Sequence, residues 1–275
     1  LEALDRLYTA AEDHERLGDV LQRRLDVEQD PELRVDLALR LGREYDEHLR
    51  RPEDAIDAYR RVLDDAPQHA DAALALARLY ERQRMWPELL DNLRMQAATQ
   101  EDPQLRVQLL FRAGEVLERE MDDVLTALPT YEEVLQLDSH FEPAIDALLR
   151  ISKLEDYRVQ ASEIVEPLLR TQERWDELAE LLEGKVSAAY DPEDKRVELR
   201  RLAEVHELGR HDNAAAFQAL SRALAEDPAD GTTADDIERI AAELGQWDKA
   251  ADVFAERASS VLDPDTSRAL YNRLA

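Results

Sequence analysis

The sequence contains no cysteine, only 7 glycines and 5% aromatic residues among its 275 positions. Without cysteine the chain has no disulfide bonds, no thiol chemistry and no zinc–thiolate sites, although this absence does not decide the compartment. No run of about 18 apolar residues occurs, so we expect no membrane-spanning segment. Glycine-rich phosphate loops and nucleophile elbows are also missing from the sequence. We therefore expect a protein that is not an enzyme and that binds no cofactor.

The residues that dominate instead are Ala, Leu, Arg, Glu and Asp. This composition is typical of an all-α protein, because most of these residues lose little on entering a helix. The net charge is −28. Since nucleic acids are bound by clustered lysines and arginines, this charge argues against a nucleic-acid partner and favours a protein or peptide.

The chain repeats itself with a period of 72 residues. The segment that begins at Asp30-Pro31 returns from Asp102-Pro103 onward. The matching positions include Leu33 and Leu105, Val35 and Val107, Arg40 and Arg112, Gly42 and Gly114, Ala55 and Ala127, Tyr59 and Tyr131, Val62 and Val134. Identity at one fixed offset is the sequence signature of repeat architectures.

Four Asp-Pro pairs predict helix starts, at Asp30, Asp102, Asp191 and Asp263. Aspartate is a preferred N-cap, and proline is tolerated at the first helical position, where its missing N–H would have no partner. Apolar residues then follow at spacings of three and four, which places them on one helix face.

One motif within each block resembles the tetratricopeptide repeat (TPR) pattern: Ala38-x2-Leu41-Gly42-x2-Tyr45, Ala55-x3-Tyr59 and Pro67. The resemblance implies a right-handed α-solenoid of antiparallel helix pairs, a TPR-like superhelix of about 16 helices. The small Gly42 and Ala55 suit close contact between the two helices of a pair. Because one extra residue separates them relative to the pattern, we expect a slightly longer loop at Arg50–Pro52.

The register of the repeat breaks after Ile151. Trp175 corresponds to Trp86 at an offset of 89 residues, which is 17 more than the period. We therefore expect an N-terminal TPR-like array at 1–151, an inserted helix and bend at 152–174, and a C-terminal array at 175–275. The chain starts in helical phase without a signal peptide and ends in mid-helix, so we expect a fragment of a longer array.

Two irregular helices and one loop are also expected. Pro167 should kink or split its helix, and Pro129 implies a late start or a bend, since an interior proline costs about 3 kcal/mol. Residues 229–233 read as a loop, with Thr233 or Asp235 capping the helix that follows.

The six histidines offer one motif-like pair, His206 and His211. The segment between them is similar to the zinc-protease HExxH motif but is one residue too long. Five positions turn a helix through about 500°, which separates the two imidazoles. Gly209 is also expected to end that helix. We therefore predict no metal site.

Trp86, Trp175 and Trp247 share one repeat position, near the start of a helix. An aromatic binding ladder is one interpretation. We favour the other, in which they pack against the turn between neighbouring helices.

In TPR-like proteins the first helix of each pair lines a concave groove, and the position after the Gly42-like residue faces that groove. The residues there are Arg6, Arg43, Arg78, Glu115, Arg150, Glu204 and Arg239. The candidate groove contacts are Arg6, Arg43, Arg78, Phe111, Arg119, Arg150 and Arg239. Arginines suit an acidic segment of a partner. Internal pairing with Asp46, Glu47, Glu81 and Glu118 is the alternative, which the sequence slightly favours.

The resemblance implies a non-catalytic protein-interaction scaffold that binds a peptide or assembly subunits through the groove. One alternative is a regulatory module in which a bound peptide shifts a conformational equilibrium. Another is the non-catalytic repeat region of a larger multidomain enzyme. Self-association is also possible, because an uncapped array exposes apolar surface.

Overall fold

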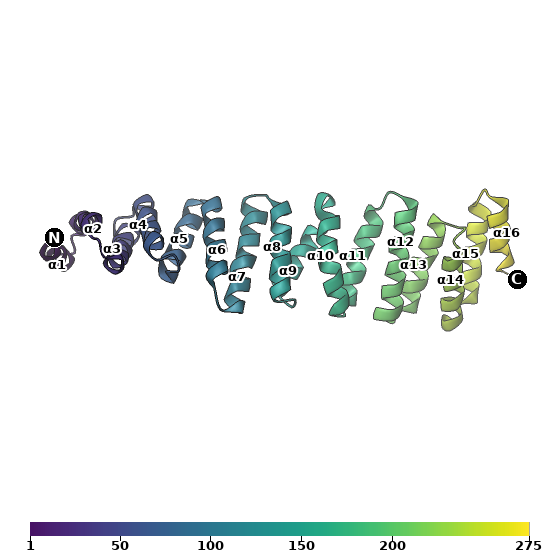
Figure 1. Ribbon diagram of the computed structural model, residues 1–275. Helices are drawn as coiled ribbons and strands as arrows, with labels where there is room; N and C mark the ends of the chain where they lie inside the picture. Colours follow the sequence, from purple (N-terminus) through teal and green to yellow (C-terminus); the bar gives the residue numbers. More distant parts are fainter. Residues whose placement is uncertain (275) are drawn as a thin grey trace. The chain divides into compact units, whose positions relative to one another are not determined.

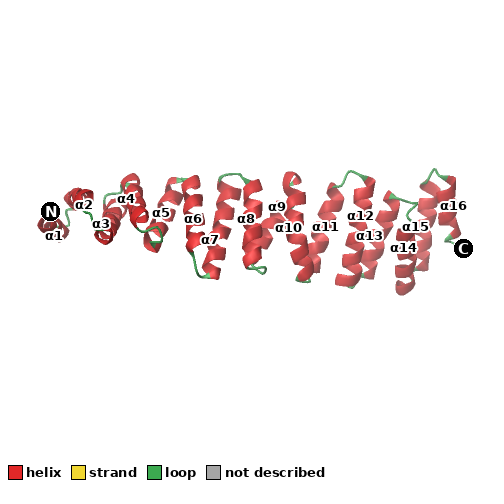
Figure 2. Ribbon diagram, in the orientation of Figure 1, coloured by secondary structure: helices red, strands yellow, loops and turns green. Residues whose placement is uncertain are grey.

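A computed structural model describes residues 1–274, which form 16 α-helices with no β-strand among them (Figure 1, Figure 2). The all-α class and the helix number predicted from the sequence are confirmed. The helices fall into two compact units, one of residues Leu1–Phe141 and one that begins at Glu142. Within the described chain, no helix is both long enough and apolar enough to cross a membrane.

Unit 1 is an α-solenoid in which each helix packs on the next one in the chain. Its helices are α1 (Glu2–Ala10), α2 (His14–Val27), α3 (Pro31–Arg43), α4 (Pro52–Asp65), α5 (Ala70–Gln83), α6 (Trp86–Thr99), α7 (Pro103–Glu115) and α8 (Val124–Leu137). Two single π turns, η1 (Glu44–His48) and η2 (Val116–Glu120), extend α3 and α7.

Unit 2 follows the same principle of neighbour-on-neighbour packing. It contains α9 (Glu142–Ile151), η3 (Glu155–Tyr157, a 3-10 turn), α10 (Arg158–Thr171), α11 (Trp175–Ala188), α12 (Pro192–Glu204), the π turn η4 (Val205–Gly209), α13 (Asn213–Glu226), α14 (Gly231–Leu244), α15 (Trp247–Ser260) and α16 (Pro264–Asn272). The expected insertion, 152–174, holds η3 and α10. Its assignment as a bend between two arrays remains a prediction.

The Asp-Pro pairs do start helices, as predicted. Asp30, Asp102 and Asp191 each accept a hydrogen bond from the N–H two residues later, at 3.0, 2.8 and 2.8 Å. Asp263 accepts from the N–H of Thr266 at 2.8 Å. Such a cap contributes about 1 kcal/mol, because it satisfies one of the free N–H groups of the first turn.

Close approach within the hairpins explains the glycines of the repeat. A Cβ on Gly42 would lie 2.7 Å from the ring of Tyr59, and a Cβ on Gly114 would lie 2.5 Å from the ring of Tyr131. Both rings are buried. Burial raises the pKa of Tyr59 to about 12. The predicted tight contact between the helices of a pair is therefore made by glycine against tyrosine, with Ala55 fully buried beside them.

The expectation of a longer loop at Arg50–Pro52 is wrong. The extra residue is taken up by the π turn Glu44–His48, where the N–H of Leu49 donates to the carbonyl of Glu44 at 3.0 Å. A π turn adds one residue to a helix without lengthening the connection. Arg50, with φ 52°, then reverses the chain, and α4 begins at Pro52. The same turn recurs in η2 and η4.

Two further local expectations need correction. Neither Thr233 nor Asp235 caps α14, because its N-cap is Asp230, whose carboxylate accepts from the N–H groups of Thr232 and Thr233. Pro129 lies inside α8, which starts at Val124 rather than late. Pro167 lies inside α10, a single helix that it does not split.

Candidate protein-binding surfaces

Three arginines of unit 1 hold one register position in successive first helices of the hairpins. Arg6 lies in α1, Arg43 is the last residue of α3, and Arg78 lies in α5. All three side chains are exposed, and none forms an ion pair with a described carboxylate. We call these three residues the arginine row.

Ion pairs between the first helices show that these helices lie side by side. They join Arg40 to Asp5 at 2.7 Å, Arg82 to Asp46 at 2.5 Å and Arg112 to Glu81 at 2.6 Å. Asp46 and Glu81, two of the residues considered as internal partners of the row, are thus paired with other arginines. The sequence did not single out Arg82 or Arg112, although each lies about one helical turn from a groove position.

A cleft of about 560 Å³ adjoins the start of the row. It is lined by Arg6, Arg24 and Arg40 around the buried carboxylate of Asp5, and the exposed Glu2 lies at 4.0 Å from Arg24. Hydrogen bonds from Arg40 and then Arg24 outweigh the burial of this carboxyl and hold the pKa of Asp5 below its usual range. Because the two carboxylates of Asp5 and Glu2 neutralise only part of the charge of three guanidinium groups, this cleft favours an anionic group.

The other two candidates of unit 1 have partners. Arg119 forms an ion pair with Glu115 at 2.9 Å. Phe111 packs edge-on against Phe141, with ring centroids 5.2 Å apart, and lies 5.7 Å from the ring of Tyr131. Phe111 is only half-buried.

The two candidates of unit 2 differ from the row. Arg239 of α14 pairs with Glu207 at 2.5 Å and with Asp236 and Glu243 at 3.4 Å. The hydrogen bonds from Arg239 lower the pKa of Glu207. Arg150 is exposed at the end of α9 and has a polar contact of its own. Their role as groove contacts remains a prediction.

The tryptophans begin helices α6, α11 and α15, as expected. Trp175 packs on Gly209, where a Cβ would lie 2.5 Å from the indole. Trp86 is half-buried, whereas Trp247 is 57% exposed. The packing interpretation therefore fits Trp175 best.

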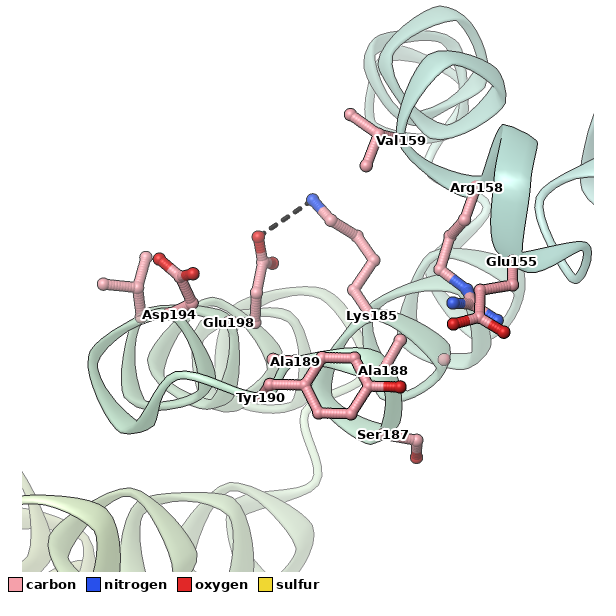
Figure 3. Close-up of a pocket in the computed structure, with 12 residues that line it drawn as sticks. Glu155, Arg158, Val159, Lys185, Ser187, Ala188, Ala189, Tyr190, Asp194 and Glu198 are labelled. Carbon is pink, nitrogen blue, oxygen red and sulfur yellow. Dashed lines mark ion pairs between the residues drawn. The ribbon is translucent and has the colours of Figure 1, made fainter.

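Unit 2 also has a cleft of about 690 Å³ that the sequence did not indicate (Figure 3). Val159 and Arg158 of α10 lie on one side of it, and Tyr190, between α11 and α12, lies on the other. An ion pair of 2.9 Å between Lys185 and Glu198 lies between these sides. Tyr190 is 92% exposed. In the sequence, the only signal for this cleft is a tyrosine directly before the Asp191-Pro192 helix start.

One comparison with known proteins supports the repeat type at the start of the chain. Residues 1–35 match the family model of the tetratricopeptide repeat. A search of curated proteins gives no significant match.

A search of solved structures gives matches to TPR proteins at low TM-scores. They include a TPR protein from Parabacteroides merdae (14% identity, TM-score 0.36, covering 98% of this chain and 94% of that one). A thermophilic TPR protein from Thermus thermophilus has 21% identity and a TM-score of 0.27, with coverages of 76% and 98%. The TPR2AB domain of yeast Sti1, solved as a complex with pHSP90, has 11% identity and a TM-score of 0.35, with coverages of 87% and 96%.

The assignment rests on the match of residues 1–35 and on the helix hairpins, with glycine packed against tyrosine in α3–α4 and α7–α8. The chain is a TPR-like helical-repeat protein.

Proposed function

We propose that the chain is a non-catalytic interaction scaffold whose unit 1 binds an acidic peptide segment through the arginine row. The observation that carries this proposal is the set of three exposed arginines at one register position, without ion pairs, in a chain of net charge −28. Carboxylates outnumber cations in this chain, 63 to 35 plus histidines. Other exposed arginines, such as Arg23 and Arg94, also lack ion pairs, so the feature that sets the arginine row apart is the register position its members share.

The chemistry of guanidinium groups suits this ligand. Arginine binds carboxylates in a bidentate manner and loses little order in doing so, because its donors are fixed in a planar fork. Because Arg6, Arg43 and Arg78 hold one register position in successive first helices, we expect them along one face of unit 1, where an extended peptide meets them in turn. The cleft around Asp5 would accept the acidic side chain at one end.

Peptide display against the purified chain tests this proposal and needs no identified partner. Peptides enriched on the unaltered chain should be rich in Asp and Glu. They should not be enriched on a variant with Arg6→Glu, Arg43→Glu and Arg78→Glu, which circular dichroism must first show to be folded. Enrichment of the same peptides on both proteins would place the binding surface elsewhere.

We also propose that unit 2 supports self-association through exposed apolar side chains of α15, of α16 and of the segment between them. Trp247 is 57%, Leu262 98% and Tyr271 48% exposed. Exposed apolar surface favours contact between copies. Sedimentation velocity should show a concentration-dependent dimer that Trp247→Ser and Leu262→Ser together abolish, and a monomer at all concentrations would contradict this.

A further inference from the structure

Two histidines and a glutamate meet in the first hairpins of unit 1. His14 is the first residue of α2, and Glu44 and His48 are the first and last residues of the π turn η1. The imidazole rings of His14 and His48 stack with centroids 4.0 Å apart and planes inclined by 9°. Nδ1 of His14 lies 2.8 Å from a carboxylate oxygen of Glu44. We call these three residues the His–Glu–His cluster.

The repeats of the same chain provide an internal comparison. At an offset of 72, His14, Glu44 and His48 correspond to Trp86, Val116 and Glu120. In unit 2 the three equivalent residues are Trp175, Val205 and Gly209. In unit 2, the residues at the positions of His14 and His48 form an apolar contact, because the indole of Trp175 packs directly on Gly209.

Two of the three positions are Trp and Val in both later repeats and carry His14 and Glu44 in the first repeat, while the third carries His48 in place of Glu120 or Gly209. Packing alone would be served by tryptophan, as it is in α11. The hydrogen bond between His14 and Glu44 does not require a second imidazole, that of His48, beside it. The combined change points to a ligand that needs all three groups.

We propose that His14, Glu44 and His48 bind one divalent transition-metal ion, with Zn²⁺ as the type. Two imidazoles and one carboxylate form a ligand set that zinc accepts, with water at the remaining position. Each residue offers one donor atom, and these atoms all lie within 4.8 Å of one another. Zinc bonds of about 2.0–2.2 Å put neighbouring donors about 3.4 Å apart. The ring of His48 is exposed, so it can turn to close this difference.

Such an ion would join α2 to the end of α3. His14 belongs to the first hairpin and the π turn to the second, so the metal would clamp the contact between two repeats. No sequence pattern indicated this site, because His14 and Glu44 are 30 residues apart and meet only through the packing of α2 on η1. The predicted absence of a metal site considered only the pair His206 and His211.

The test is zinc titration of the intact, chelator-treated chain by calorimetry, followed by Co²⁺ substitution and visible absorption spectroscopy. We expect one Zn²⁺ per chain. The Co²⁺-substituted chain should show the strong visible d–d bands of a four-coordinate cobalt ion. A variant carrying His14→Trp, Glu44→Val and His48→Gly reproduces the residues of Trp175, Val205 and Gly209. It should keep the fold by circular dichroism and lose both signals.

Single changes make the test independent of that triple variant. Glu44→Gln and His48→Gln should each weaken zinc binding by at least about tenfold. Glu47→Gln changes a carboxylate in the same π turn, and His140→Gln removes an exposed histidine elsewhere, so both should bind zinc unchanged. No stoichiometric binding to the unaltered chain, or equal binding by Glu44→Gln and Glu47→Gln, would overturn the proposal.

Discussion

Replacement of Gly114 by alanine tests the close packing of the hairpins most sharply. A Cβ at this position would lie 2.5 Å from the ring of Tyr131, which is fully buried and therefore cannot move aside. Overpacking of a well-packed core costs about 1–3 kcal/mol. Alanine recovers at most about 1 kcal/mol of helix propensity over glycine. We expect Gly114→Ala to lower the free energy of unfolding by up to about 2 kcal/mol.

Gly184 provides the matched control. It is exposed within α11, and a Cβ there would meet no atom within 4 Å. Gly184→Ala should therefore raise the stability by up to about 1 kcal/mol, because only the propensity difference acts. Urea unfolding followed by circular dichroism compares the two variants with the unaltered chain. A stabilising Gly114→Ala, or two changes of the same sign, would refute the account of packing.

Three further predictions concern a helix cap, a carboxyl group and the tryptophans. Asp191→Ala should cost about 1 kcal/mol in urea unfolding, whereas Asp191→Asn should cost little, since asparagine also caps; equal losses would argue against the cap. Burial of Asp230 is outweighed by hydrogen bonds from Thr232, Thr233 and Arg196, so its pKa is held well below the usual range. The ionised carboxyl of Asp230 therefore stabilises the fold above pH about 4, its unfolded pKa, and this stabilisation is lost as the pH falls further. The loss of unfolding free energy caused by Asp230→Asn should shrink in acid, and a loss that does not change with pH would contradict this. In single-tryptophan variants, acrylamide should quench Trp247 more strongly than Trp86 or Trp175, and equal quenching would show that the exposure of 57% is not present in solution.

Much of the fold was predictable because local signals and the repeat agree. The Asp-Pro pairs act within a few residues, and the period of 72 transfers each assignment to the next block. Gly42 and Tyr59 belong to one motif whose spacing already implies contact between two helices. The helix number and the starts at Asp30, Asp102, Asp191 and Asp263 followed from these features.

The π turns were not predictable in the same way. An extra residue between Gly42 and Ala55 can be placed in a loop or in a helix, and the sequence does not distinguish these. The turn forms because it keeps backbone hydrogen bonds, such as that from Leu49 to Glu44, which a longer loop would expose to water. The cap of α14 was misplaced for a related reason, since Asp230, Thr232, Thr233 and Asp235 are all acceptable caps.

Surfaces formed between distant residues were missed altogether. Val159 and Tyr190 form opposite sides of a cleft only because α10 packs on α11, a consequence of tertiary structure. The pairing of Asp46 with Arg82 was likewise missed, because it depends on which rotamers these two side chains adopt. The arginine row itself was identified from its register, whereas its lack of internal partners came from the structure.

The measurement that tests the central claim most directly is the affinity of a display-selected acidic peptide, determined by fluorescence anisotropy. An exposed ion pair contributes about 0.2–1 kcal/mol, so reversal of Arg6, Arg43 and Arg78 should cost about 1–3 kcal/mol in binding. This corresponds to about 5- to 150-fold weaker binding.

The matched control reverses the same number of charges elsewhere, with Arg23→Glu, Arg94→Glu and Lys249→Glu. These three residues lie in α2, α6 and α15, are exposed, and form no ion pair among the described residues. The account predicts that the control binds the peptide within about twofold of the unaltered chain, while reversal of the arginine row weakens binding at least about fivefold. Equal loss in both variants would mean that net charge alone governs binding, and no loss in either would mean that the arginine row is not the binding surface.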